Sequence, residues 1–285
     1  MKSLITLFSG LFFLSACTTM TPFPKEQSRI ALVIGNADYQ FISQLKNPVN
    51  DAKGMSKVLE DLGFHVIHEE NANRQAMEKA VNTFKQNLEM EQSKGKQTVA
   101  LFYYSGHGTQ YGDENYLLPV AIDTESSNNL DTIFSSDTIA LSDVITGMEK
   151  AKANMQIVVL DACRDNPFKN DGFKVASKSI GKGLAWIDNT NSDSFAPQGS
   201  FIAYATAPNA VAYDEGRYNS PYTKHLLKRI REEGVSIETL FKEVRNAVIE
   251  EMGGRQIPWE SSSLKSDFYF AGEGLKRRTM SAGFQ

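Results

Sequence analysis

The stretch "VVLDACRDNPF", residues 158–168, runs from apolar residues through an acid and a thiol into charged residues. A short apolar run that ends this abruptly is typical of a buried β-strand and the turn after it. A second apolar run, "TVALFYYSG" at 98–106, is followed by His107 and another glycine. The thiol of Cys163 and the imidazole of His107 are the two groups of a nucleophilic pair, so the relative position of these two runs decides what the fold can do.

Apolar runs alternate with amphipathic segments along the rest of the chain. We expect strands at 30–36, 64–70, 98–105, 155–161, 200–206 and 266–272, and a hairpin at 110–120. Helical periodicity predicts helices at 47–62, 73–92, 138–152, 220–232 and 236–252. This order predicts an α/β fold in which helices cover both faces of a mainly parallel six-stranded sheet. Sites form at the carboxyl ends of the strands in such sheets, so Cys163 and His107 should meet there.

Glycines flank His107 on both sides, at Gly106 and Gly108. Glycine gives the backbone conformational freedom, and we expect the imidazole to be exposed and the Gly108 amide to point into a cleft. The amides of Gly108 and Cys163 would then form an oxyanion hole for the carbonyl oxygen under attack. For one isolated cysteine, a small buried side chain at a strand end is the alternative.

The first residues, "MKSLITLFSGLFFLSAC", have a basic start, a short apolar core and a cysteine at position 17. This pattern predicts a signal peptide over 1–16. The ending Leu-Ser-Ala-Cys resembles the lipobox of bacterial lipoproteins. That resemblance implies lipidation of Cys17, a tether over 17–28 and a location in the bacterial cell envelope, at the outer membrane. An ordinary secretory signal that is cut nearby is the alternative.

The other composition data narrow the function classes. The chain has two cysteines, so Cys163 has no partner for an intrachain disulfide once Cys17 carries lipid. An unpaired thiol in an oxidising compartment is either buried or used. The formal net charge of -4 gives no reason to expect nucleic acid as a partner. His65 and His68 lie three residues apart on an expected strand and should face different sides, so we expect no metal site. No cofactor motif appears.

The blocks "YYSGHGTQ" and "VVLDACRDNPF" resemble the His and Cys blocks of caspase-like cysteine peptidases, the superfamily of caspases, metacaspases and bacterial relatives. The separation of the two blocks, roughly 50 residues, also resembles that family. Further similar blocks follow in the family's order: "ALVIGNADY", "LKNPVNDAKGMSKVLEDLGF", "GKGLAW", "FIAYATAPNAVAYD", "NSPYTKHLL" and "RQIPWESSSL". The resemblance implies a caspase-like three-layer α/β/α sandwich over 29–275 with a tail at 276–285. It also implies His107 and Cys163 as a catalytic dyad without an obligatory third side chain.

Two acids bear on substrate specificity. Asp161, two residues before Cys163, stands where caspases typically have Gln and metacaspases have Asp. Asp51 matches a position where metacaspase-like members have a second acid and caspases a basic residue. The resemblance therefore implies cleavage of protein or peptide substrates after Arg or Lys, because carboxylates attract a basic P1 side chain and repel an acidic one. The alternatives are a loop-capping carboxylate for Asp161 and a favourable first-turn acid in a helix for Asp51.

Two further segments carry expectations. The block "YATAPNAVAYD" resembles the segment that lines the substrate groove, which implies pairing of Tyr204, Ala205 and Thr206 with an extended peptide; ordinary sheet packing is the alternative. Relatives are often cut after the nucleophile strand, so we hypothesise self-cleavage in the polar stretch 164–199. The lysines there are Lys169, Lys174, Lys178 and Lys182. The chain shows no EF-hand pattern that would support calcium activation.

A Cys–His site leaves three functions open. The sequence predicts a cysteine endopeptidase, because both reactive residues are present. The alternatives are a caspase-like binding or regulatory module with little turnover, and another Cys–His acyl-transfer hydrolase such as an amidase. The sequence does not indicate the oligomeric state.

Overall fold

The computed structural model describes residues 27–112, 114–123, 129–163, 199–207 and 212–272. The predictions for the signal peptide, for Cys17, for self-cleavage at the four lysines and for the tail at 276–285 lie outside the described residues. The strands are β1 (Gln27–Gly35), β2 (Phe64–Glu70), β3 (Gln97–Tyr111), β4 (Glu114–Leu117), β5 (Ile139–Ala140), β6 (Met155–Cys163), β7 (Ser200–Tyr204) and β8 (Trp259–Ser262). The helices are α1 (Pro48–Asp61), α2 (Arg74–Ser93), α3 (Leu130–Ser136), α4 (Leu141–Lys150), α5 (Pro221–Arg229) and α6 (Ile237–Glu251).

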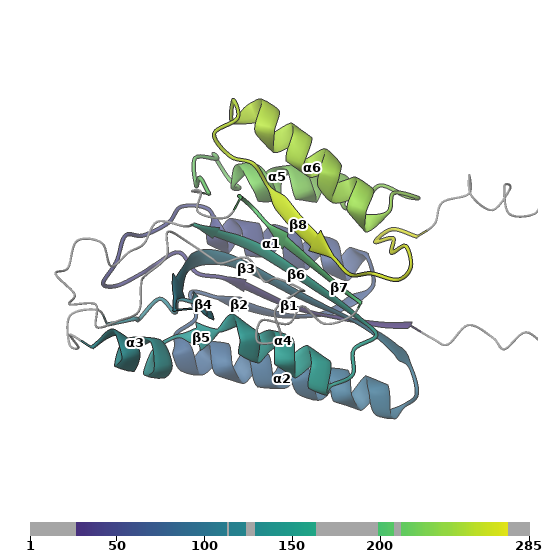
Figure 1. The fold of residues 1–285 in the computed structure, drawn as a ribbon, viewed down its shortest axis with the longest axis horizontal. Coiled ribbons are helices and arrows are strands. Elements are labelled where there is room, and N and C mark those ends of the chain that lie inside the picture. The colour runs from purple at the N-terminus through teal and green to yellow at the C-terminus, as the bar shows by residue number, and fades with distance from the viewer. Residues whose placement is uncertain (1–26, 113, 124–128, 164–198, 208–211, 273–285) are drawn as a thin grey trace, which may run out of the picture.

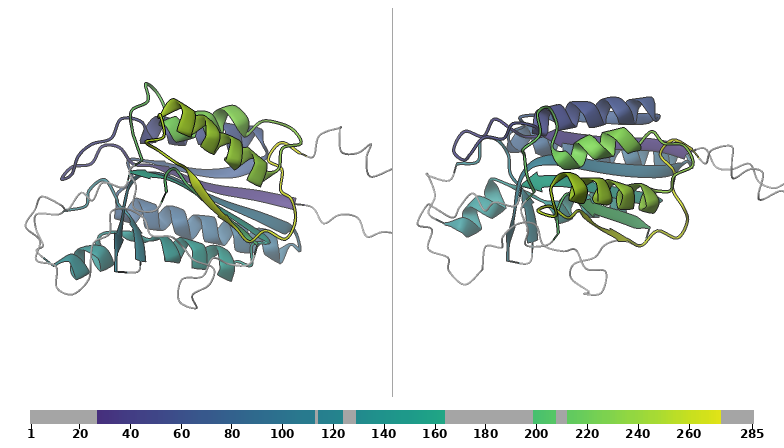
Figure 2. Two further views of the ribbon diagram at one scale, coloured as in Figure 1. Left: turned by 45° about the horizontal axis from the view of Figure 1, so that its top comes forward. Right: turned by 90° about the horizontal axis from the view of Figure 1, so that it is seen from above.

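The main sheet has the strand order β2-β1-β3-β6-β7-β8 (Figure 1). Neighbouring strands from β2 to β7 are parallel, and β8 is antiparallel to β7. Helices lie on both sides of this sheet, α1, α5 and α6 on one side and α2 and α4 on the other (Figures 1 and 2). The predicted three-layer α/β/α sandwich with a mainly parallel six-stranded sheet is confirmed.

The apolar core has two halves because successive side chains of a strand point to opposite faces of the sheet. Leu101, Ile157 and Phe201 pack with α1, α5 and α6, whereas Phe102 and Val158 pack with α2 and α4. All of these side chains are buried. Runs that are apolar at every position therefore supply both faces, which explains why the strands show no alternation in the sequence.

The predicted last strand at 266–272 is wrong. Its place at the edge of the sheet is taken by β8, and the aromatic run Phe268, Tyr269 and Phe270 is buried without forming a strand. The guanidinium of Arg29 donates to the carbonyl oxygens of Tyr269 and Phe270. The Arg29 side chain thus satisfies part of the backbone of this segment, and the rings of Phe268 and Phe270 pack in the core with α6.

Strand β3 is longer than the sequence predicts. It continues past Ser105 to Tyr111 and turns back into β4 as the expected hairpin. Strand β4 also pairs with the short strand β5, and the sequence did not reveal β5 or the short helix α3. This extension carries the His107 block beyond the point where β1 ends, since the last paired residues of β1 and β3 are Gly35 and Ser105.

Local sequence signals place several helix starts correctly. Asn73 is the N-cap of α2 and its side chain accepts a hydrogen bond from the amide of Ala76. Pro48 is the first residue of α1, and the side chain of Asn47 before it makes no cap bond and donates instead to the carbonyl oxygens of Asp214 and Gly216. None of the helices in the described ranges is long and apolar enough to cross a membrane.

Candidate active site

The pairing of β3 with β6 brings the two reactive residues together. In this parallel pair Ser105 lies opposite Asp161, and His107 lies opposite Cys163. The sequence placed both His107 and Cys163 just after their strands, whereas the structure places both within them. Neighbouring strands lie about 4.8 Å apart, so the backbones of His107 and Cys163 are direct neighbours.

The imidazole of His107 is buried, with 3% of the residue exposed, and not exposed as the flanking glycines led us to expect. The loop after β1 folds over it. The carbonyl oxygen of Ser43 lies 2.8 Å from Nε2, and the ring of Tyr39 lies 4.6 Å from the imidazole between centroids. A carbonyl oxygen only accepts, so Nε2 carries the proton in this contact and Nδ1 is the basic nitrogen of the neutral ring.

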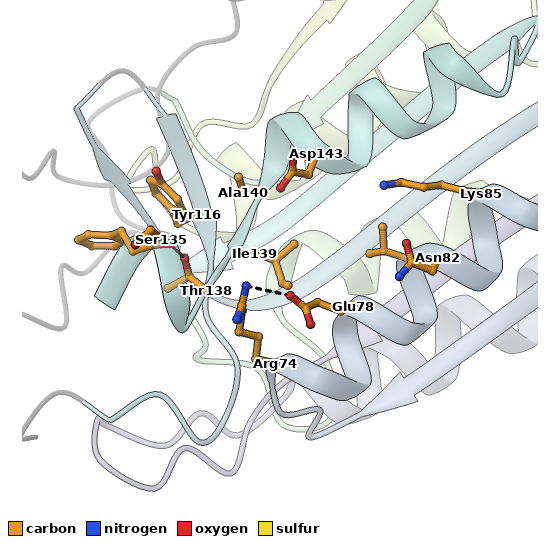
Figure 3. A pocket seen from close by; sticks show the side chains of 12 residues that line it. Arg74, Glu78, Asn82, Lys85, Tyr116, Ser135, Thr138, Ile139, Ala140 and Asp143 are labelled. Atoms are coloured by element: carbon orange, nitrogen blue, oxygen red, sulfur yellow. Dashed lines mark hydrogen bonds and ion pairs between the residues drawn. The ribbon is translucent and has the colours of Figure 1, made fainter. Parts of the chain in front are cut away.

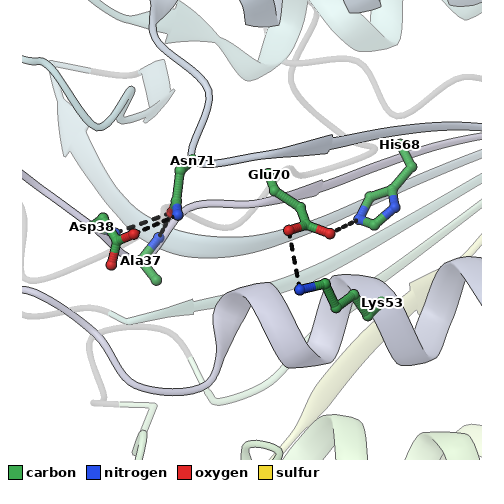
Figure 4. Close-up of polar contacts among 6 residues, drawn as sticks. All are labelled: Ala37, Asp38, Lys53, His68, Glu70 and Asn71. Atoms are coloured by element: carbon green, nitrogen blue, oxygen red, sulfur yellow. Dashed lines mark hydrogen bonds and ion pairs between the residues drawn. The ribbon is translucent and has the colours of Figure 1, made fainter.

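The loop that covers His107 is anchored at its start by Asn71. The side-chain oxygen of Asn71 accepts hydrogen bonds from the amides of Ala37 and Asp38, and its nitrogen donates to the carboxylate of Asp38 (Figure 4). Asn71 has a positive φ of 48°, a conformation that asparagine tolerates better than most residues. The contact fixes where the loop leaves β1 and thereby where Ser43 meets the imidazole. Nearby, Glu70 joins Lys53 of α1 to His68.

Asp161 is buried at the carboxyl end of β6, with 5% of the residue exposed. Its Oδ2 accepts hydrogen bonds from the hydroxyls of Ser220 and Thr223 at the start of α5, the second at 2.6 Å. Thr223 in turn pairs with the hydroxyl of Tyr103 at 2.6 Å. Through these bonds Asp161 connects the end of β6 to the start of α5. This is the structural role that the sequence analysis gave as the alternative to substrate binding.

Asp51 reaches the same helix start from α1. Its Oδ1 accepts from the amide of Ser220 at 3.0 Å and from the side chain of Asn219 at 2.9 Å, and its Oδ2 accepts from the Ser105 hydroxyl at 3.3 Å. Asp51 is completely buried. Both acids therefore meet at Ser220, where the amino end of a helix favours negative charge. The sequence predicted both acids but not this shared anchor.

Burial raises the pKa values of both acids. The pKa of Asp51 rises to about 8, first because the carboxylate is removed from water and second because Asp161 is also negative. The pKa of Asp161 rises to about 6 through loss of solvation, against the lowering effect of the two hydroxyls. A positive group bound beside these two buried acids would lower their pKa values and favour the ionised form of both carboxyl groups. The two acids therefore form a site that favours a bound cation.

A third acid, Asp214, was missed in the sequence. Its carboxylate accepts hydrogen bonds from the amides of Lys46 and Asn47, just before α1. Its charge contributes to the raised pKa values of Asp51 and Asp161. Asp214 is the last residue of the block "YATAPNAVAYD", which resembles a groove-lining segment, but only the contact with the segment before α1 shows that its carboxylate lies near the other two acids.

The predicted substrate-pairing segment is partly engaged within the sheet. Tyr204 pairs with β6 on one side and with β8 on the other. The amide of Ala205 donates to Leu160, and its carbonyl oxygen accepts from Gln256. For Tyr204 and Ala205 these contacts are ordinary sheet packing, the alternative that the sequence left open.

Gly108 continues β3 directly after His107 and lies opposite Leu117 of β4. Gly108 is buried. The carbonyl oxygen of the preceding residue, His107, accepts a hydrogen bond from the amide of Leu118. Gly108 follows His107 on β3 and Cys163 lies opposite His107 on β6, so the two residues of the predicted oxyanion hole lie on neighbouring strands.

A separate hollow of about 610 Å³ lies among α2, β5 and α4 (Figure 3). It is lined by both signs of charge, and its Arg74 and Glu78 form an ion pair at 2.8 Å. No cysteine or histidine lines it. Within the described ranges, no three His, Cys, Asp or Glu side chains gather into a group that could hold a metal ion. The carboxyl ends of β3 and β6, where His107 and Cys163 lie, are therefore the candidate active site.

Curated relatives match much of the chain at low sequence identity. The chain is 24% identical over 233 residues to caspase-12 of Canis lupus familiaris, covering 78% of this chain and 56% of that protein. It is 25% identical over 225 residues to the mucosa-associated lymphoid tissue lymphoma translocation protein 1 of Homo sapiens, covering 76% and 23%. The chain therefore spans about half or less of the length of these curated relatives.

The fold has a solved counterpart. The structure of pro-Sf-caspase-1 superposes with a TM-score of 0.55 at 17% sequence identity, covering 88% of this chain and 92% of that chain. At this identity the likeness concerns the fold alone. A model of the caspase domain family matches residues 28–269, which include both strand ends and all three acids. The chain belongs to the caspase domain family.

Proposed function

We propose that this protein is a cysteine endopeptidase that cleaves peptide bonds after Arg or Lys, with Cys163 as nucleophile and His107 as acid and base. The observation that carries the proposal is the register of β3 and β6, which sets His107 opposite Cys163. Family membership supports a peptidase, and the tautomer that Ser43 selects leaves Nδ1 available as the base.

The proposed reaction has two halves. The Cys163 thiolate attacks the carbonyl carbon of the scissile bond, and the oxygen becomes negative in the field of the Gly108 and Cys163 amides. The imidazolium of His107 gives its proton to the leaving amine, and a thioester remains on Cys163. A water molecule then loses a proton to His107 and attacks the thioester, which releases the acid product and restores the thiol.

The preference for a basic residue rests on Asp51 and Asp161. Both carboxylates are buried and resist ionisation on their own. An ammonium or guanidinium group that enters beside them gains two opposite charges in a low dielectric, whereas an acidic side chain would add a third buried negative charge. The Ser105 hydroxyl, which already donates to Asp51, is a further polar group at this position.

The test uses fluorogenic peptides that differ only in an Arg, Lys or Asp at P1. Hydrolysis of the Arg and Lys peptides is expected, and Cys163→Ala or His107→Ala should reduce it by at least about a thousandfold. Cleavage that survives in both variants would contradict the dyad, and cleavage after Asp would contradict the basic preference. A folded protein that binds the Arg peptide without turnover, with and without calcium, would favour the binding module instead.

The second part of the proposal concerns location. We propose that Cys17 carries lipid and holds the domain at the bacterial outer membrane, on the strength of the Leu-Ser-Ala-Cys ending. Expression of the full chain and of Cys17→Ser, followed by membrane fractionation and intact mass measurement, tests it. We expect the unaltered chain in the membrane fraction with an acyl mass, and the variant without that mass. Equal masses would reject the lipid anchor.

A further inference from the structure

Two buried tyrosines bind the backbone of His107. The amide of His107 donates to the hydroxyl of Tyr39 at 2.7 Å, and its carbonyl oxygen accepts from the hydroxyl of Tyr104 at 2.8 Å. Tyr104 belongs to β3 itself, whereas Tyr39 comes from the loop after β1. Side chains therefore bind the peptide groups on both sides of His107, in addition to the amide of Leu118, which donates to the same carbonyl oxygen.

The two hydroxyls form one consistent network with Leu118. The carbonyl oxygen of Leu118 lies 3.2 Å from the Tyr39 hydroxyl and 3.1 Å from the Tyr104 hydroxyl, and the two hydroxyls lie 3.3 Å apart. Each hydroxyl has one proton to donate. When Tyr104 donates to His107 and Tyr39 donates to Leu118, the His107 amide also has its acceptor. A satisfied polar network in a buried setting specifies one geometry more sharply than apolar contacts do.

Gly106 is required by this network. A Cβ atom at that position would lie 2.8 Å from the Tyr39 hydroxyl and 2.7 Å from the Tyr104 hydroxyl. Real Cβ contacts are essentially never that short. The absence of a side chain at Gly106 thus leaves room for the two hydroxyls beside the backbone of β3. The sequence had suggested a different role for this glycine, namely to let the imidazole be exposed.

Tyr39 acts on the ring of His107 as well as on its backbone. Its ring lies 4.6 Å from the imidazole, with an interplanar angle of 54°. The same loop supplies the Ser43 carbonyl oxygen that binds Nε2, and Asn71 anchors that loop at Ala37 (Figure 4). One loop therefore contributes a backbone contact, a ring contact and the tautomer-selecting contact.

We propose that Tyr39 is a positioning residue for His107 and that Tyr104 completes the same clamp. The two hydroxyls hold the His107 backbone at the distance from which Nε2 reaches Ser43, and this keeps Nδ1 as the basic nitrogen. The kinetic consequence rests on the proposed peptidase function, whereas the orientation of the imidazole can be measured without it.

The kinetic test compares three variants that each remove one tyrosine hydroxyl. Tyr39→Phe and Tyr104→Phe remove the clamp, and Tyr111→Phe is the control, since its hydroxyl donates to Asp131 at 2.9 Å and its ring lies in the same apolar cluster as Tyr39. We expect kcat for an Arg-P1 peptide to fall about 10- to 100-fold in the first two, because small displacements of a reacting group are costly. KM should stay within about twofold, because neither variant touches the acids. Thermal unfolding of each sample gives the fraction of folded protein at the assay temperature, and the enzyme concentration is corrected by that fraction.

A spectroscopic test addresses the imidazole directly. The chain has four histidines, so a sample labelled with ¹⁵N in histidine gives a simple spectrum, and His107→Gln assigns the signal. We expect a protonated Nε2 that exchanges slowly with water in the unaltered chain and in Tyr111→Phe. In Tyr39→Phe we expect a mixture of tautomers and fast exchange.

Several outcomes decide the inference. It is overturned if Tyr39→Phe keeps both the kcat and the Nε2 signal of the unaltered chain, or if Tyr111→Phe loses as much as Tyr39→Phe. Should Tyr39→Phe fail to fold, Tyr104→Phe decides by the same two readouts. If the unaltered chain cleaves none of the peptides, the proposed function fails, and the Nε2 signal alone still supports or overturns the clamp.

Discussion

The side of the sheet that α2 and α4 cover carries mainly apolar side chains and the Tyr104 ring up to the carboxyl ends of the strands, whereas the side that α1 and α5 cover carries acids and hydroxyls there. On the first side lie Ile34, Leu160 and Ala162, all buried in one apolar cluster. On the second side Asp161, with Ser105 opposite it, is tied to the start of α5 through Ser220. The same strands thus build a core on one face and a site on the other, because adjacent side chains point to opposite faces.

The largest expected effect is a loss of stability caused by a cavity on the side of the sheet that α2 and α4 cover. Phe102→Ala removes a fully buried ring next to α2 and α4 and should lower the free energy of unfolding by about 3–5 kcal/mol. Urea unfolding followed by circular dichroism measures it. A loss below about 1 kcal/mol would mean that this face contributes less to stability than its burial indicates.

The second effect concerns activity on the polar side. Asp161→Asn keeps an oxygen that accepts from Ser220 and Thr223 but removes the charge. We expect kcat/KM for an Arg-P1 peptide to fall about 100-fold, with little change in stability, because a lost buried charge pair costs several kcal/mol of binding. The matched control is Asp143→Asn, which alters an exposed acid in the first turn of α4. An unchanged preference for Arg over Leu at P1 would remove Asp161 from the pocket.

The third effect is a pH dependence of stability. Because the pKa of Asp51 is raised from 3.8 to about 8, the folded state keeps a proton that the unfolded state releases. Stability from this group is therefore present at low pH and is lost as the pH rises from about 4 to about 8. Urea unfolding at pH 5, 7 and 9 should show a smaller fall in Asp51→Asn than in the unaltered chain. If stability fell more steeply with pH in Asp51→Asn than in the unaltered chain, the pKa of Asp51 would be lowered in the folded state rather than raised.

The smallest effect is expected at Ser105. Its hydroxyl lies 3.3 Å from Asp51, a long hydrogen bond that Ser105→Ala removes without creating a large cavity. We expect a two- to fivefold rise in KM for the Arg peptide, since one such bond contributes about 0.5–1.5 kcal/mol. Steady-state kinetics measure it, with Ser135→Ala on the exposed surface of α3 as control. A fall in kcat at constant KM would instead place Ser105 in the chemistry of His107.

Much of the fold followed from local sequence. The strand at 64–70 was predicted with the bounds of β2, and the helix predicted at 73–92 agrees with α2 and its cap Asn73 to within one residue at its end. The strand predicted at 266–272 failed for a tertiary reason. The aromatic run at 268–270 has the composition of a strand, but the edge of the sheet is occupied by β8.

The site was predicted less completely than the fold. His107 and Cys163 stood out because their residue types and surroundings carry chemistry. Ser43 did not, because it contributes a backbone carbonyl oxygen, a group that every residue has. Tyr39 also gave no signal, since a tyrosine in a loop after a strand has no pattern that connects it with a histidine far along the chain.

By itself, the sequence predicted most strands and helices in their order and pointed to His107, Cys163 and two acids, because periodicity and side-chain chemistry are local properties. Only the tertiary structure decided that His107 lies opposite Cys163, that Asp51 and Asp161 meet at Ser220, and that Tyr39 binds the backbone of His107 while Ser43 binds its imidazole. These contacts join segments far apart in the chain. Strand register and loop closure depend on which surfaces are buried together, and no single stretch of sequence contains that information.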